Sequence, residues 1–123
     1  MPKVYLWDTS LISAPGPRFE NLIALHLLKL VHYLQDCEGF DVELYYLRDK
    51  AGHEVDFLVT SGKKPWFAVE AKLNASGVDP SLVYFRKRLK IPWVYQVMMQ
   101  GGRDVEDNGV RSLPARQFLG SLV

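Results

Sequence analysis

The sequence has no long hydrophobic run, and no segment approaches the roughly 20 apolar residues that a membrane-spanning helix requires. We therefore expect no association with a membrane. Cysteine is almost absent: Cys37 stands alone, so an internal disulfide cannot form. Because the N-terminal segment also lacks the pattern of a secretory signal, we expect a cytoplasmic protein.

A strong excess of charge of either sign is missing too, since the formal net charge at pH 7 is +1. Tight binding to nucleic acid without sequence preference depends on many phosphate contacts, and the overall charge argues against it. A local basic patch can still attract a polyanion when the total charge is near zero. The composition thus leaves nucleic acid open as a substrate or partner.

Internal repeats, low-complexity tracts and linkers are absent, as is a glycine-rich loop of the kind that binds nucleotide phosphates. Hydrophobic residues make up 48% of the chain and charged residues 24%, which is typical of a globular protein. The 123 residues suit a single domain, residues 1–123, with one core.

The order of the predicted elements indicates an α/β sandwich. Apolar residues recur at helical spacing from Pro17 to Leu34 and cover most sides of the helix, so we expect that helix to be buried. Short turns between the next three segments favour antiparallel strands. In chain order we predict a strand at 3–7, the first helix, strands at about 42–48, 53–60 and 66–72, a helix at Pro80–Leu89 capped by Asp79, a strand at 92–98, a polar loop at 101–109 and a short helix at 114–122.

Three charged residues stand inside or at the end of otherwise apolar strands. Side chains alternate between the two faces of a strand. The alternation places Glu54, Asp56 and Leu58 opposite Val55, Phe57 and Val59, and Trp66, Ala68, Glu70 and Lys72 opposite Phe67, Val69 and Ala71. An unpaired charge is costly to bury, so Asp56 and Glu70 need partners or a metal ion.

These residues form a coherent chemical unit if the two strands are neighbours. Asp56 and Glu70 have the oxygen ligands that Mg²⁺ (or Mn²⁺) prefers, and the Ala71 carbonyl would add another. Lys72 could orient an attacking water or stabilise charge on a phosphate. Glu20, in the first turn of the first helix, offers a third acid for the metal or for catalysis. The alternatives are an ordinary salt-bridge cluster, and for Glu20 a helix-start acid stabilised by the helix dipole.

Two motifs carry a resemblance to known proteins. Gly52-His53-Glu54-Val55-Asp56-Phe57, followed by Phe67-Ala68-Val69-Glu70-Ala71-Lys72, resembles the PD-(D/E)xK superfamily, with restriction endonucleases and Holliday-junction resolvases as relatives. More narrowly, the chain is similar to the domain of unknown function 4143 (DUF4143) at the C-terminal end of prokaryotic AAA-type ATPases. The similarity also includes Lys3 to Asp8, Phe19-Glu20-Asn21 and Tyr45 to Phe57, and covers nearly the whole chain.

The resemblance implies a restriction-endonuclease-like, three-layer sandwich, in which a mixed central sheet is flanked by helices around an α-β-β-β-α-β core. It also implies that Glu20, Asp56, Glu70 and Lys72 occupy nuclease-type positions for Mg²⁺-dependent hydrolysis of DNA. The family's ATPase module is missing from these residues, so the chain is expected to be a stand-alone remnant or a fragment, with an ATPase as a candidate partner.

The alternative function is a non-catalytic module on the same fold that binds DNA or a protein, or has a regulatory role. Relatives of the fold often pair, and Trp66, Trp93, Met98 and Met99 could supply the apolar contacts of a homodimer.

The segment Arg86-Lys87-Arg88 with Lys90 forms a basic helical stretch that either contacts nucleic-acid phosphates or is a solvated helix face. Gln96 is expected on a strand that borders the cleft. His26, His32 and His53 lack the spacing of zinc ligands, so each is expected to be a core or surface histidine.

Overall fold

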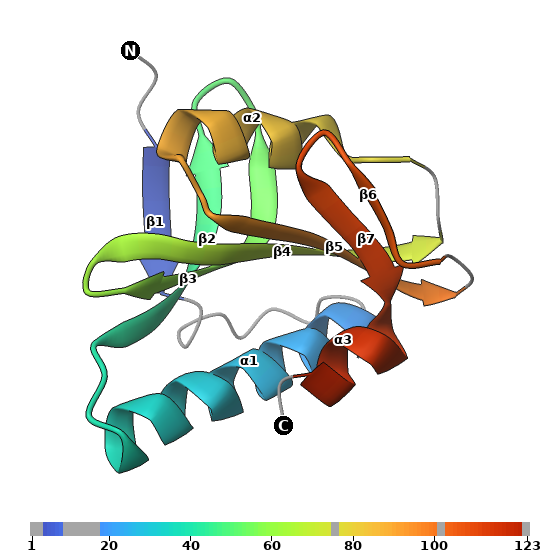
Figure 1. Cartoon of the computed structure of the whole chain (residues 1–123). Helices are drawn as coiled ribbons and strands as arrows, with labels where there is room; N and C mark the ends of the chain where they lie inside the picture. The colour runs from blue at the N-terminus through green and yellow to red at the C-terminus, as the bar shows by residue number, and fades with distance from the viewer. Residues whose placement is uncertain (1–3, 9–17, 75–76, 101–102, 122–123) are drawn as a thin grey trace.

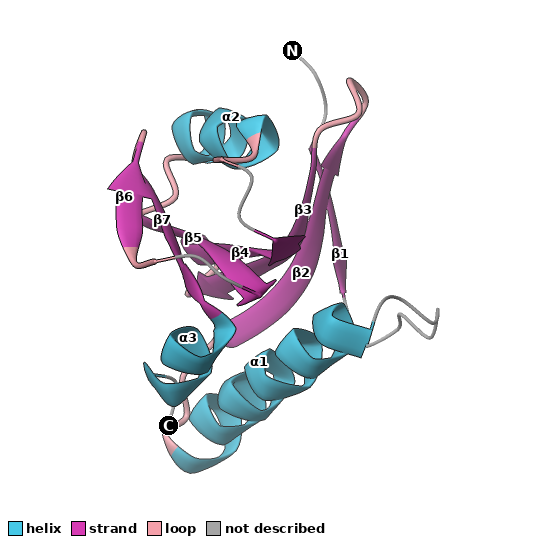
Figure 2. Ribbon diagram, turned by 90° about the vertical axis from the view of Figure 1, so that its right-hand side faces the viewer, coloured by secondary structure: helices cyan, strands magenta, loops and turns pink. Residues whose placement is uncertain are grey.

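A mixed β-sheet forms the middle layer of the molecule, and helices cover both of its faces (Figure 1). The computed structural model describes residues 4–8, 18–74, 77–100 and 103–121 of the 123-residue chain. Helix α2 lies on one face of the sheet, and α1 and α3 lie on the other (Figure 2). The elements are β1 (Val4–Asp8), α1 (Arg18–Cys37), β2 (Val42–Asp49), β3 (Glu54–Ser61), β4 (Lys64–Asn74), α2 (Pro80–Leu89), β5 (Trp93–Gln100), β6 (Val105–Asp107), β7 (Val110–Pro114) and α3 (Ala115–Ser121).

Within the described residues, the sheet has seven strands in the order β1-β2-β3-β4-β5-β7-β6. Strands β1 to β4 pair antiparallel, and the predicted hairpins are confirmed. The pairs β4–β5 and β5–β7 are parallel, and α2 makes the crossover between β4 and β5. The predicted mixed α/β architecture and the α-β-β-β-α-β order are therefore confirmed. No helix in the described parts of the chain is long and apolar enough to cross a bilayer.

The core between α1 and the sheet consists of aliphatic and aromatic side chains. Ile23, Leu27 and Val31 form one stripe of α1, at the three-to-four-residue spacing of a helix, and are buried. Phe118 of α3 joins the same core. The opposite side of α1 was predicted to be buried as well, which is wrong. Leu22 and Leu25 are exposed because no described element packs over that side.

The second core lies under α2, where Leu82 and Phe85 pack against the sheet. Asp79 caps this helix by accepting a hydrogen bond from the Ser81 backbone N–H at 2.8 Å, and Pro80 occupies the first turn, as predicted. The helix ends at Leu89 and is followed by the C-cap residue Lys90, whose φ of 54° is left-handed.

A polar network also ties α2 to the turn between β2 and β3. The buried carboxylate of Asp49 accepts the His53 backbone N–H at 2.9 Å and lies 3.1 Å from His53 Nδ1. The His53 ring stacks on Tyr84 of α2, with ring centroids 3.8 Å apart. Gly52, with a φ of 92°, makes the turn in a conformation that other residues rarely adopt. His53 thus has a structural role, consistent with the prediction.

The predicted face of Val55 is wrong because β3 contains a bulge. The register between β2 and β3 passes from Tyr45↔Leu58 to Leu47↔Val55, so β3 has one extra residue in this interval. Val55 therefore packs with Leu58 in the core under α2. Asp56 lies inside the bulge, and bulges commonly redirect side chains in this way.

The predicted face of Trp66 is wrong because β4 also contains a bulge: the register passes from Val59↔Phe67 to Thr60↔Pro65, so Trp66 is an extra residue of β4. The register between β3 and β4 shifts next to Val59. Trp66 packs with Phe67 on the α1 side, with ring centroids 5.0 Å apart, and not with Ala68.

Two further predictions are corrected by the C-terminal third of the chain. Residues 101–109 were predicted to be a polar loop, but they include β6, which pairs with β7 around a turn at Asn108 and Gly109. Met98 was expected to contribute to a dimer surface but is buried. Trp93 and Met99 are exposed, as a contact surface requires.

Candidate functional site

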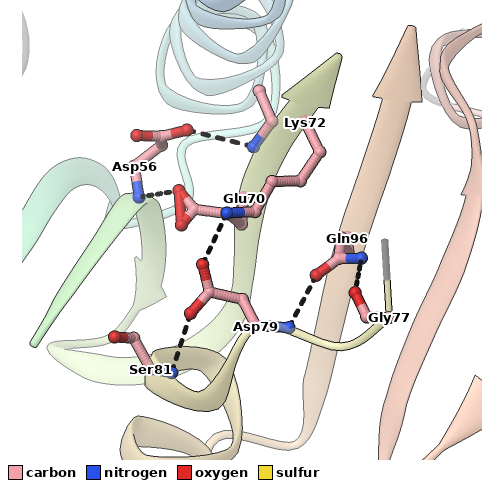
Figure 3. Close-up of polar contacts among 8 residues, drawn as sticks. Asp56, Glu70, Lys72, Gly77, Asp79, Ser81 and Gln96 are labelled. Atoms are coloured by element: carbon pink, nitrogen blue, oxygen red, sulfur yellow. Dashed lines mark hydrogen bonds and ion pairs between the residues drawn. The ribbon is translucent and has the colours of Figure 1, made fainter. Parts of the chain in front are cut away.

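The candidate site lies where β3 and β4 separate, on the α2 side of the sheet (Figure 3). The backbone pairing of these strands ends at Phe57↔Val69. One residue further, the Asp56 backbone N–H donates to Glu70 Oε1 at 3.2 Å, and the Ala71 N–H donates to Asp56 Oδ2 at 3.0 Å. The two carboxylates therefore take the place of backbone acceptors at the point where the strands diverge.

Burial gives this carboxylate pair an unusual affinity for protons. Glu70 is only 7% exposed, and Asp56 is half-buried. Burial, followed by the hydrogen bond and charge of Asp56, raises the pKa of Glu70 to about 10. Burial is also the main cause that raises the pKa of Asp56. Without a cation, the pair therefore retains a proton at neutral pH.

The Ala71 carbonyl borders the same gap between the strands. Because the N–H and C=O of one strand residue point to the same side, the Ala71 carbonyl lies on the side of Asp56, to which its N–H donates. Two carboxylates and a carbonyl are hard oxygen ligands, a set that suits Mg²⁺, an ion that keeps several waters. In the part of the chain that the structure describes, no cluster of three or more acidic, histidine or cysteine side chains could hold a metal ion. The donor set fits Mg²⁺ and gives no support for zinc.

Lys72, on the same strand β4 as Glu70, adds a positive charge to the candidate site. Its ammonium lies 2.7 Å from Asp79 Oδ2, and the side chains are 34% and 17% exposed, respectively. Burial opposes ionisation of both groups, but the ion pair outweighs it, so the pKa of Asp79 is lowered and that of Lys72 is raised. The charges of Glu70 and Asp56 also act on Lys72. The site thus has a fixed cation beside a protonated carboxylate pair.

Gln96 anchors the loop that carries Asp79. Its side chain is 1% exposed; Oε1 accepts the Asp79 N–H at 2.9 Å and Nε2 donates to the Gly77 carbonyl at 2.7 Å. Gln96 was expected to border the cleft, and the structure places it behind the loop at 77–79 instead. Figure 3 shows the chain of contacts from β5 through this loop to Lys72.

The structure brings Asp56, Glu70, Ala71 and Lys72 together but not every predicted residue. Glu20 lies in the first turn of α1, and its side chain is outside what the structure describes. The predicted basic residues lie at the other end of α2 from Asp79. They are Arg86, Lys87 and Arg88 in the last turn and Lys90 at the C-cap.

These basic residues are about 10–15 Å from the helix start, at 1.5 Å per residue. The Arg86 guanidinium packs over Gly109 in the β6–β7 turn, while Lys87 and Lys90 are exposed. Within this basic segment, Arg86 therefore packs against the protein, whereas Lys87 and Lys90 face solvent.

Asp79 was predicted only to cap α2, and its contact with Lys72 was not predicted. A signal was available, because Asp79 precedes the helix that crosses from the Glu70–Lys72 strand to the next one. The loop geometry that brings the two side chains together could not be read from spacing.

Comparison with models of protein families gives a match over most of the chain. The family model described as "Domain of unknown function (DUF4143)" matches residues 15–118. No curated protein and no solved structure matches the chain.

Proposed function

We propose, from the premise that the chain belongs to the DUF4143 family, that its Asp56–Glu70 site is a Mg²⁺-dependent nuclease centre that hydrolyses DNA phosphodiester bonds. The observation that carries the proposal is the buried carboxylate pair at the separation of two strands, next to a fixed lysine ammonium. Paired carboxylates at such a position favour a divalent cation over permanent burial of a proton. The mixed sheet between helical layers is consistent with a restriction-endonuclease-like fold, which we include in the proposal.

Each residue has a distinct task in this proposal. Asp56, Glu70 and the Ala71 carbonyl hold the cation, and Glu20 is a candidate for a further ligand or for binding water. A bound Mg²⁺ supplies positive charge that acidifies water and stabilises the phosphate in the transition state. Lys72 keeps its ammonium near the carboxylate pair, where it stabilises the negative charge that develops on a phosphate oxygen.

The substrate side of the proposal rests on exposed cations at the far end of α2. Lys87 and Lys90 are exposed and can contact the DNA backbone about 10–15 Å from the start of α2. Arg86 could join them if it leaves Gly109. Such contacts position a duplex without reading its sequence. We propose DNA as the partner, and a second copy of the chain or an ATPase as candidate protein partners.

Cleavage by the purified chain tests the proposal. Single-stranded, duplex, nicked and branched DNA are incubated with Mg²⁺ or Mn²⁺, using wild type, Asp56→Asn, Glu70→Gln and Lys72→Met. We expect each substitution to reduce cleavage roughly 100-fold or more. Asp104→Asn is a matched control, because it breaks an ion pair with Arg111 away from the site and should leave cleavage unchanged.

The competing function is a binding module without catalysis. Cleavage that survives Asp56→Asn and Glu70→Gln would come from a contaminant and would refute the nuclease proposal. Absence of cleavage together with absence of Mn²⁺ binding in calorimetry would favour the binding module.

A further inference from the structure

We propose that Asp79, held in place by Gln96, is the residue that positions the Lys72 ammonium at the carboxylate pair. The inference deepens the proposed function, since it concerns the same site and rests on a nuclease role for Lys72. It adds Asp79 and Gln96, which lie outside the Glu70-Ala71-Lys72 strand, to the residues of the proposed active site. One belongs to the start of α2 and the other to β5.

The Lys72 side chain needs such a partner. A lysine stem has four rotatable bonds, so an unanchored ammonium would sample many positions. Lys72 is one-third exposed, so the protein does not enclose its side chain completely. Its ammonium has three N–H donors; Asp79 Oδ2 takes one at 2.7 Å, and the others remain for a substrate oxygen or a water.

Asp79 is suited to the task because it is itself held at several points. Its Oδ1 accepts the Ser81 N–H at 2.8 Å, which uses one carboxylate oxygen for the helix cap and leaves the other for Lys72. Its backbone N–H donates to Gln96 at 2.9 Å, and Pro80 restricts the next φ angle. A surface ion pair between mobile side chains contributes little, but here the acceptor is fixed before the lysine binds.

Gln96 fixes the loop by a two-sided contact. A glutamine amide has both a donor and an acceptor, and in this buried position each is matched to one backbone group, the Gly77 carbonyl and the Asp79 N–H. The strand β5 pairs in parallel with β4, with Gln96 directly beside Glu70 in the register. The same sheet therefore sets the positions of the carboxylate pair and of the loop that holds Lys72.

Asparagine at position 79 separates positioning from capping. Asparagine is as good an N-cap as aspartate, so Asp79→Asn retains the Ser81 contact but removes the anionic oxygen that holds Lys72. Alanine removes both. If Asp79 only caps α2, the asparagine variant will behave like wild type; if it positions Lys72, the asparagine variant will already show the defect.

Nuclear magnetic resonance of the lysine ammonium groups tests the positioning without any need for cleavage. In the ¹⁵N-labelled full chain we expect a slowly exchanging Lys72 ammonium signal, identified by its loss in Lys72→Arg. The signal should disappear in Asp79→Asn, weaken in Gln96→Leu and persist in the matched control Asp104→Asn. Absence of a Lys72 signal in wild type, or its persistence in Asp79→Asn, would overturn the proposal; an unchanged signal in Gln96→Leu would refute the part played by Gln96.

Kinetics provide the second readout. With cleavage-competent DNA, Asp79→Asn should lower kcat about 10- to 100-fold, with KM and the Mn²⁺ dissociation constant changed less than about threefold. A wild-type kcat in Asp79→Asn would overturn the proposal. If the wild type does not cleave DNA, the nuclease function fails, while the ammonium spectra still decide whether Asp79 positions Lys72.

Discussion

Replacement of Glu70 by glutamine should stabilise the metal-free protein at neutral and alkaline pH. The unfolded chain loses the Glu70 proton near the ordinary value of 4.5, whereas the folded chain retains it up to a pKa of about 10. Over that interval the folded state binds more protons, so the free energy of unfolding falls as the pH rises. Glutamine has the shape of the protonated acid and can keep the contact with the Asp56 N–H, but it does not titrate.

The size of the effect follows from the same shift. A single proton retained by the folded state changes stability by on the order of 1 kcal/mol per pH unit. From about pH 6 to pH 8 the wild type should therefore lose about 2 kcal/mol relative to Glu70→Gln, or roughly 5–10 °C in Tm for a domain of this size. Below about pH 4, where both states of the wild type are protonated, the two proteins should have nearly equal stability.

Thermal unfolding in EDTA, followed by circular dichroism from pH 5 to pH 8, measures this difference. The exposed Glu106 on β6 gives a matched control, since Glu106→Gln removes a carboxylate of the same type from a solvated position. Parallel curves for wild type and Glu70→Gln would show that the pair does not retain a proton, and the electrostatic description of the site would be wrong.

Three further outcomes are expected. Binding of Mn²⁺ at pH 7 should release about one proton, seen in calorimetry as a dependence of the heat on the buffer, and no release would contradict the protonated pair. Phe85→Ala should lower the free energy of unfolding in urea by about 3–5 kcal/mol, because the ring is fully buried between α2 and the sheet. A decrease below about 1 kcal/mol would refute that packing. Gly109→Ala should cost about 1 kcal/mol and displace Arg86, because the residue has a φ of 78° and a new Cβ would overlap the guanidinium; unchanged stability would argue against that turn.

The sequence predicted the elements well where local patterns determine them. The three antiparallel strands, the capped helix α2 and the strand β5 follow from alternation, turn residues and the Asp79-Pro80 start. Strands β6 and β7 were not predicted. Residues 101–109 were expected to be a polar loop because all of β6 is exposed and its residues are polar or charged except Val105. Such a strand forms because its neighbour β7 is available, and that neighbour is set by tertiary structure.

The candidate site was predictable as a set of residues but not as a geometry. Alternation correctly placed Glu70 and Lys72 on one face. A bulge in β3, however, places Val55 on the opposite face from the predicted one, and no residue type in this segment predicts the extra residue. The contact of Lys72 with Asp79 depends on a loop that a distant glutamine holds. Both features arise from long-range pairing, which spacing along the chain does not encode.

The amide groups of Asp56 and Ala71 donate to carboxylates, whereas most amides of a sheet donate to carbonyls. The chemical shift of an amide proton responds to the charge of its acceptor. The Ala71 amide therefore reports the ionisation of Asp56, and the Asp56 amide reports that of Glu70. Two cross-peaks of an ordinary amide spectrum can thus follow proton loss and cation uptake at each carboxylate separately, in the unmodified chain.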